Sequence, residues 1–231
     1  MTGHQLSQYR KQRKRTQMQT ARALGVSQAY LSLLEAGKRP VPTRLQRKAV
    51  TFFDLPPTEV PAQLTFGELP VVTDDQLASD LADLGYLGFA HLRRKRPHRK
   101  NPADVLFNTL NAPQRDARIM EALPWLILAY PDMEWPQVIR AAKVNDLQNR
   151  LGFVVSVARE LADARGDTEL SEKLGEQEHA LDHSRLARED TFCNARMTNA
   201  ERKWLTTNRP RTAKRWRILT SLSPKLVRYA N

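Results

Sequence analysis

The stretch from Thr16 to Arg39, TQMQTARALGVSQAYLSLLEAGKR, constrains the fold of this 231-residue chain more than any other. Thr16 is a good N-cap for a first helix, and Gly25 ends that helix because glycine adopts the left-handed conformation without steric cost. Ser27 then caps a second helix, which Gly37 stops. The sequence therefore predicts two short helices joined by a tight turn, which is the spacing of a helix-turn-helix.

Two further helices are predicted on either side of this pair. The first runs from Gln5 to Lys14, with Leu6 and Tyr9 as its inward residues. The second opens at Pro42, and its apolar residues are expected to close a small core: Leu45, Ala49, Phe52 and Phe53.

From Gln5 to Leu55 the chain resembles the lambda-repressor/Cro-like (XRE) helix-turn-helix family. In that family a short TQ helix, a G-V-S turn and a Q-x-Y-L-S-x-x-E-x-G-K-R segment recur together, as they do here. The resemblance implies DNA binding through seven residues: Gln17, Ser27, Gln28, Ala29, Ser32, Lys38 and Arg39.

The resemblance implies a particular role for six of these positions. Gln17 would touch a phosphate, the residues at the start of the second helix (Gln28, Ala29 and Ser32) would face base edges, and Lys38 and Arg39 would grip the backbone. The resemblance also implies a structural ion pair between Arg10 and Glu35. Arg15 and Thr20 depart from it, since both stand where the family usually has aliphatic core residues.

The charge of the N-terminal part supports a nucleic-acid partner. Residues 1–50 contain eleven Lys and Arg against one acid, Glu35. Neutralisation of phosphates requires such an excess, because affinity rises through counterion release with each contact. Two capped helices around a glycine also occur in helical bundles that never meet DNA, and the charge argues against that alternative.

Composition bounds the rest of the chain. A net charge of +12 favours a polyanionic partner, and a hydrophobic content of 41% is enough for a packed core. The single cysteine, Cys193, excludes an intramolecular disulfide framework. The polar N-terminus and the short apolar run of about Ala122 to Tyr130 argue against a signal peptide and a membrane span, so a soluble, cytoplasmic protein is expected.

After the first domain the charge inverts, with seven acids and no Lys or Arg in residues 51–90. Prolines between Pro56 and Val72 indicate a linker, with a short strand at Gln63–Phe66 as an option. Thr73 caps a predicted helix that Gly85 terminates. This acidic helix is interpreted as solvated, with masking of the basic domain as the alternative. The basic run at 91–100 predicts an exposed loop that contacts nucleic acid or an acidic protein.

The centre of the chain is a succession of helical patterns. Pro102, Pro113 and Pro124 are each expected to begin a helix, because the missing N–H of proline is harmless in a first turn. The clearest amphipathic pattern runs from Asp146 to Gly166. Three aromatic residues are assigned to the same core: Trp125, Tyr130 and Trp135.

Four runs in this region resemble the C-terminal part of helix-turn-helix antitoxins from bacterial toxin–antitoxin operons, especially those paired with a nucleotidyltransferase-like toxin. They are LGYLGF, NPADVLFNTL, EALPWLILAYPDMEW and AKVNDLQNRLGFVVSVAREL. The resemblance implies that the C-terminal domain holds the toxin while the N-terminal domain represses the shared promoter.

The last segment, residues 191–231, has ten Lys and Arg against one acid, Glu201. Thr198 and Pro210 are expected to start two helices, and basic residues near tryptophan indicate either nucleic-acid contact or docking of Trp216 on the core. The best candidate for catalysis is a group of titratable residues, among which His179 and His183 stand one helical turn apart: Glu178, His179, Asp182, His183 and Cys193. No third metal ligand follows at typical spacing, so a solvated polar helix is preferred there.

Together these patterns predict an all-α protein. A five-helix-type helix-turn-helix domain at 1–55 is followed by a linker at 56–72 and a larger helical partner or effector domain at 73–231. The predicted function is that of a repressor, without cofactor, metal or enzymatic activity, which binds a palindromic double-stranded operator as a homodimer and is the antitoxin for a cognate toxin protein. The alternatives are a ligand-sensing regulator and an RNA-binding or metal-dependent catalytic protein.

Overall fold

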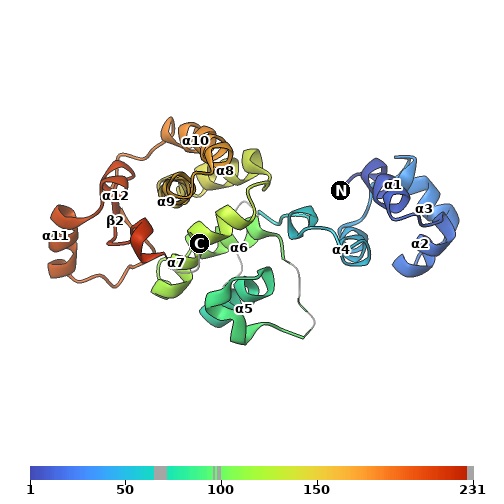
Figure 1. Ribbon diagram of the computed structural model, residues 1–231, viewed down its shortest axis with the longest axis horizontal. Coiled ribbons are helices and arrows are strands. Elements are labelled where there is room, and N and C mark those ends of the chain that lie inside the picture. The colour runs from blue at the N-terminus through green and yellow to red at the C-terminus, as the bar shows by residue number, and fades with distance from the viewer. Residues whose placement is uncertain (65–71, 96, 98–99, 228–231) are drawn as a thin grey trace. The chain divides into compact units, whose positions relative to one another are not determined.

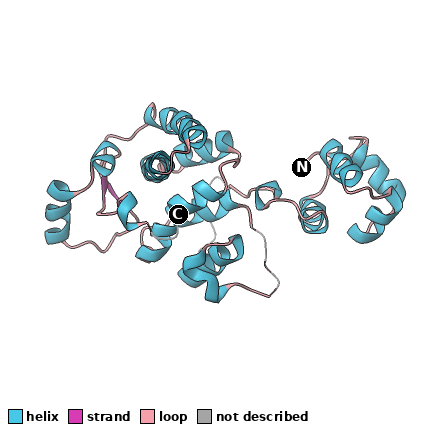
Figure 2. Cartoon of the chain, viewed as in Figure 1, coloured by secondary structure: helices cyan, strands magenta, loops and turns pink. Residues whose placement is uncertain are grey.

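The computed structural model describes residues 1–64, 72–95, 97 and 100–227. Helices dominate it, which confirms the all-α prediction (Figure 1, Figure 2). The strands in the described residues are the two-residue segments β1 (Asp190–Thr191) and β2 (Ile218–Leu219), which pair in parallel. Residues 65 and 66, half of the Gln63–Phe66 strand option, lie outside the described residues, as do positions 96, 98 and 99 of the basic run, while residues 63 and 64 are not in a strand.

The described residues separate into two compact units. Residues 1–63 and 100–101 form the first, here called the N-terminal unit, and the other described residues form the C-terminal unit. The N-terminal unit contains four α-helices and a 3-10 turn: α1 (Gly3–Gln12), α2 (Gln17–Leu24), α3 (Gln28–Glu35), α4 (Thr43–Phe52) and η1 (Pro57–Glu59).

The ends of α2 and α3 follow the capping residues of the sequence. Thr16 and Ser27 are the N-caps of the two helices, and Gly25 after α2 has φ of +72°. Gly37 after α3 has φ of +71°. A β-carbon at either glycine would be strained in that left-handed conformation, so the turn and the stop both depend on glycine.

One cluster of buried side chains holds the N-terminal unit together. It draws on all four helices and on the segments before and after α4: Leu6, Ala21, Leu24, Leu31, Leu34, Val41, Leu45, Ala49, Val50, Phe53, Leu55 and Val60. The prediction was wrong for Phe52, which is 37% exposed while Val50 takes the inward position. At Gly3 a β-carbon would lie 1.7 Å from the Leu34 carbonyl oxygen, so only glycine lets the start of α1 reach the end of α3.

The C-terminal unit is built around one helix, α9 (Gln148–Ala164), which is buried along most of its length. The other helices of this unit before the C-terminal segment are α5 (Asp74–Leu84), η2 (Leu87–Leu92), α6 (Pro102–Leu110), α7 (Ala117–Ala129), α8 (Trp135–Val144) and α10 (Thr168–Asp182). Helix α10 packs along α9, and α7 and α8 also contact α9 (Figure 1). The amphipathic pattern predicted at 146–166 therefore marks the helix around which this unit packs.

Two expectations about this unit are corrected by the structure. Pro113 lies in a loop and Pro124 lies inside α7, whose N-cap is Asp116. Pro124 cannot donate to a carbonyl one turn earlier, but its ring is buried in the core and contributes to the packing there. The choice of a first-turn role for these prolines was therefore wrong.

The interpretation of α5 as a solvated helix was also wrong. Its apolar residues are buried, and two of its acids, Asp80 and Asp83, are almost fully buried as well. The Arg94 guanidinium pairs with both carboxylates at 3.2 Å, and the Arg94 N–H donates to Asp83. These acids therefore fix one arginine of the basic run at 91–100 within the C-terminal unit.

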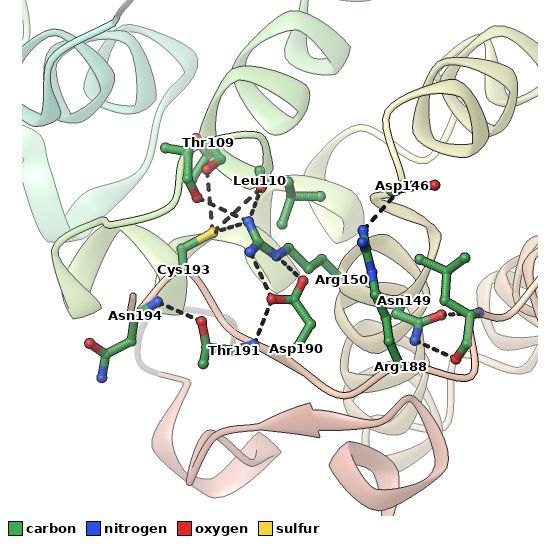
Figure 3. A network of polar contacts seen from close by, with 12 residues as sticks. Thr109, Leu110, Asp146, Asn149, Arg150, Arg188, Asp190, Thr191, Cys193 and Asn194 are labelled. Atoms are coloured by element: carbon green, nitrogen blue, oxygen red, sulfur yellow. Dashed lines mark hydrogen bonds and ion pairs between the residues drawn. The ribbon is translucent and has the colours of Figure 1, made fainter. Parts of the chain in front are cut away.

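A buried arginine ties α9 to the segment that follows α10 (Figure 3). Arg150 Nε and Nη2 pair with the Asp190 carboxylate at 2.7 and 3.0 Å, and Nη1 donates to the carbonyls of Leu110 and Ala112. The Cys193 sulfur lies 3.4 Å from Nη1, and burial raises the pKa of this thiol to about 11. Arg150 therefore joins three separate stretches of chain, and Cys193 stays a protonated, buried thiol.

The C-terminal segment closes the unit over α9. It contains α11 (Asn199–Asn208), α12 (Arg211–Arg215), β2 and the 3-10 turn η3 (Pro224–Leu226), with Thr198 and Pro210 as the two helix caps, as predicted. Trp216 is fully buried, and its Nε1 donates to Ser156 Oγ at 2.7 Å. Of the two roles left open for this tryptophan, docking on the core is correct. No helix in the described part of the chain has the length and apolar character to cross a membrane.

Candidate nucleic-acid interface

Helices α2 and α3 form the helix-turn-helix of the N-terminal unit. The Thr16 hydroxyl accepts from the Gln19 N–H while the Gln19 side chain accepts from the Thr16 N–H, which gives α2 a capping box. The Ser27 hydroxyl accepts from the Tyr30 N–H at 3.2 Å and starts α3. Leu31 and Leu34 anchor the inward face of α3 in the core, so its opposite face is free for a partner.

Most of the residues implied for DNA binding lie on the surface. Six are exposed, at the start and middle of α3 and just past its end: Ser27, Gln28, Ala29, Ser32, Lys38 and Arg39. The Arg39 guanidinium also lies over the Tyr30 ring, 5.9 Å from its centroid. The structure therefore presents these six residues together around one helix, with polar groups at its start and basic groups at its end.

Gln17 differs from the others because it is half-buried and hydrogen-bonded. Its amide nitrogen donates to Glu35 Oε2 at 2.9 Å. Arg10 Nε and Nη2 donate to the same carboxylate at 2.6 and 2.9 Å, and Arg10 Nη1 donates to the Arg15 carbonyl at 3.0 Å. Glu35 thus joins the end of α3 to α1 and to the start of α2, and this orients the recognition helix.

The chemistry of Glu35 follows from these contacts. Burial alone would raise its pKa, but the hydrogen bonds from Arg10 and Gln17 and the charges of Arg10 and Lys11 together hold the pKa below its usual value. Glu35 is therefore ionised at neutral pH. The side chains of Arg10 and Glu35 are 12% and 6% exposed, so water screens the ion pair little.

One contact near the turn was not predicted from the sequence. The Lys48 ammonium on α4 donates to the Leu24 carbonyl at 3.1 Å, where α2 ends. A cation at a helix C-terminus satisfies an orphan carbonyl and the helix dipole. Lys48 therefore supports the turn, although the sequence pattern gave it only as one of eleven basic residues.

The two departures from the family pattern have different environments. Thr20 is fully buried, and its hydroxyl has no hydrogen-bond partner in the described part of the chain. An unsatisfied buried hydroxyl is costly, so this position weakens the core. Arg15 is exposed, and its side chain is thus not a core residue here.

Exposed basic side chains lie just past α3 and on α4. Lys38 and Arg39 follow the helix, and Arg44 and Arg47 project from α4. None of these four forms an ion pair with another described residue. Unpaired cations of this kind are available to neutralise phosphates.

The titratable residues considered for catalysis are not brought together as one group: Glu178 and Asp182 both pair with Arg215, and Cys193 lies apart from them. Glu178 is buried and pairs with Arg159 at 3.0 Å and with Arg215. His179 and His183 stack edge to face, while Cys193 lies in the Arg150 network. Within the described residues, no three His, Cys, Asp or Glu side chains are grouped as metal ligands would be.

Comparison with known protein families agrees with this geometry. A family model described as a helix-turn-helix domain matches residues 3–63. The match is consistent with the lambda-repressor/Cro-like resemblance and covers the whole four-helix part of the N-terminal unit. Searches of curated proteins and of solved structures gave no match. The N-terminal unit is a helix-turn-helix domain, and it indicates a DNA-binding regulator.

Proposed function

We propose that the protein is a sequence-specific transcriptional repressor that binds a palindromic operator as a homodimer. The observation that carries the proposal is the exposed face of α3, where Gln28, Ala29 and Ser32 stand clear of the core while Lys38 and Arg39 flank them. An amide at the start of a recognition helix can bond adenine N6 and N7 together. One such helix reads only a few base pairs, so two half-sites about 34 Å apart are expected.

The first prediction separates base reading from phosphate binding. Gln28→Ala should weaken operator binding by about 1–3 kcal/mol and leave binding to random DNA unchanged, because only the operator offers the matching base. Arg39→Ala should weaken binding to both and make the salt dependence shallower by about one unit. Titration of the full chain with operator and random duplexes at several salt concentrations measures both effects.

The matched control is Arg140→Ala, which removes an exposed arginine from the C-terminal unit. It should change neither operator affinity nor the salt slope. If Gln28→Ala binds the operator as the parent does, the base-reading role of this helix face is wrong.

We further propose that the protein is an antitoxin that represses its own operon and takes no catalytic part. In this proposal residues 1–55 read DNA, 56–72 link the domains and 73–231 bind the toxin. The support is the resemblance of the four central runs, three of which coincide with the α6, α7 and α9 helices of the C-terminal unit, while LGYLGF lies at the end of α5 and in η2. Because much of these helices is buried, the resemblance concerns the framework of the unit more than its surface.

The second prediction tests this proposal by growth. Expression of the neighbouring gene alone should arrest growth, and co-expression of the full chain should restore it. Gln28→Ala should restore growth as well as the parent while failing to repress the promoter, since neutralisation is assigned to the C-terminal domain. A neighbouring product that leaves growth unaffected would remove the antitoxin role but not the repressor role.

A cavity favours ligand sensing as a second candidate. A pocket of about 490 Å³ lies in the C-terminal unit, between the start of α7 and the segment from Phe192 to Leu226. Its wall is mixed, with apolar Met120, Leu205 and Leu222 near polar Gln114 and Arg115. Pockets of this size and character hold small molecules. A metabolite that changes operator affinity without any protein partner would favour this function over the antitoxin.

A further inference from the structure

Helix α11 leaves a large aromatic side chain in solvent. The helix packs beside β2, and Leu205 is its one buried residue (Figure 1). Trp204, the next residue before it, is 58% exposed. By contrast, the neighbouring Trp216 is fully buried. A single exposed apolar side chain is common on protein surfaces, so the residues around Trp204 decide which partner it fits.

Unpaired basic side chains surround this tryptophan in the chain. Between Asn194 and Arg217 six basic residues are exposed and form no ion pair with any described residue: Arg196, Arg202, Lys203, Arg211, Lys214 and Arg217. Arg209 and Arg215 of the same stretch are already paired, with Glu189 and Glu178. The one acid, Glu201, accepts from the Thr198 N–H and hydroxyl and so serves as the cap of α11. The surface of α11 and α12 therefore carries an excess of free positive charge.

The small apolar content of this surface argues against a protein partner. Between Asn194 and Arg217, Trp204 is the single large apolar side chain exposed. Its neighbours one helical turn away are small or polar: Ala200, Glu201, Thr207 and Asn208. Protein interfaces have a core of several apolar side chains, which the stretch from Asn194 to Arg217 does not expose. The cations lie on the other faces of α11 and on α12, which contacts β2 as α11 does, so the indole and the charges together fit a ligand that offers a flat ring and negative charge.

We propose that α11 and α12 bind single-stranded nucleic acid, with a base stacked on Trp204 and phosphates held by Arg202, Lys203 and the basic residues of α12. A duplex encloses the faces of its bases, whereas a single strand exposes them for stacking. The two kinds of contact, ring face and phosphate charge, do not involve the sugar. The site therefore accepts RNA and DNA strands alike. It is independent of the duplex-reading face of α3 and goes beyond the repressor function.

The third prediction uses tryptophan fluorescence of the full chain. Residues 1–63 contain no tryptophan, so quenching reports binding at the C-terminal unit and ignores strands held by the N-terminal unit. Unstructured oligo-dT and oligo-U of about 12 nucleotides should quench the tryptophan fluorescence of the parent. The affinity of the Trp204→Ala variant is measured by competition with a labelled strand, in the presence of excess duplex that occupies the N-terminal unit. This variant should bind the strand roughly 5- to 150-fold more weakly than the parent. Trp204→Phe should retain most of the affinity because a phenyl ring also stacks.

Charge variants and competitors complete the test. The double change Arg202→Ala with Lys203→Ala should weaken strand binding and flatten its salt dependence, while the control Arg140→Ala with Lys143→Ala should do neither. Strand binding unaffected by Trp204→Ala overturns the proposal. The proposal is also overturned if polyglutamate displaces the strand as readily as an oligonucleotide does, because the site would then fit an acidic protein. Equal quenching of the fluorescence by a duplex would overturn it as well. A preference above about tenfold for one sugar would contradict the stated contacts.

Duplex titration of the same variants keeps the two functions apart. Trp204→Ala should bind the operator as the parent does. Failure of operator recognition by α3 would leave the quenching result unchanged, so either proposal can fail alone.

Discussion

Replacement of Glu35 by alanine is expected to lower the free energy of unfolding of the N-terminal unit by about 3–5 kcal/mol, because it leaves the Arg10 guanidinium buried without its partner. The same change removes the acceptor for Gln17 and so loosens the start of α2. A unit of this size has a small margin of stability. Hydrogen exchange of the α1 to α3 amides should therefore accelerate by about a hundredfold or more.

Two variants serve as controls for this prediction. Gln17→Ala removes one hydrogen bond and should cost only about 0.5–1.5 kcal/mol. The double change Arg10→Met with Glu35→Leu should recover much of the loss, because no charge is then buried alone. The exchange rates of the Glu35→Ala variant could instead stay within a factor of about two of those of the parent. That ratio corresponds to a stability change well under about 1 kcal/mol, and the pair would then not hold the helices together.

The pH dependence of the same pair has a definite sign. The pKa of Glu35 is lowered in the folded state. Its contribution to the free energy of unfolding is therefore fully present above the pKa of a glutamate in the unfolded chain, about 4.3. It is lost as the pH falls through the lower folded value. The Glu35→Ala variant should therefore show less acid sensitivity than the parent in this range.

Replacement of Trp216 by alanine is expected to cost the C-terminal unit about 3–5 kcal/mol and to lower its melting temperature by roughly 6–20 °C. The ring is fully buried, and Gly152 on α9 makes room for it: a β-carbon there would lie 2.3 Å from two ring carbons. The truncation would leave a cavity beside α9 and an unpaired Ser156 hydroxyl. Urea or thermal unfolding followed by the remaining tryptophans measures the loss.

The chain provides its own matched control in Trp204→Ala, which removes the same side chain from an exposed position and should shift stability by at most about 0.5 kcal/mol. Trp216→Phe should fall between the two, since it keeps ring packing and loses the hydrogen bond to Ser156. Gly152→Ala should destabilise by displacing the Trp216 ring. Equal, small effects of Trp216→Ala and Trp204→Ala would contradict the assignment of Trp216 to the core.

The parts of the fold that could be predicted are those that local chemistry decides. Thr16, Gly25 and Ser27 act on backbone groups within three or four residues, so the sequence indicates the helix ends directly. Pro124 was misplaced because a proline in a first turn and a proline in a buried helix interior carry the same local signal. The burial of Asp80 and Asp83 depends on Arg94, ten or more residues away, which no periodicity reveals.

The same distinction holds for the candidate site. The exposed face of α3 follows from its helical period, since Leu31 and Leu34 fix which side is inward. The contacts that orient the helix join distant positions, such as Gln17 with Glu35 and Lys48 with Leu24, and only the folded chain brings them together. A resemblance indicated Arg10 and Glu35 as a pair, and the structure places them in contact.

The late position of Trp216 in the chain sets the order of events during synthesis. The apolar core of the N-terminal unit is complete at Val60, whereas α9 lacks the part of its cover that Trp216 and β2 supply until those residues have been made. At typical elongation rates of about 5–20 residues per second, roughly 8–30 seconds separate the two points. During that interval a nascent chain carries a finished helix-turn-helix tethered to a unit whose central helix still lacks part of its cover, and the open apolar face of that helix is accessible to chaperones and proteases.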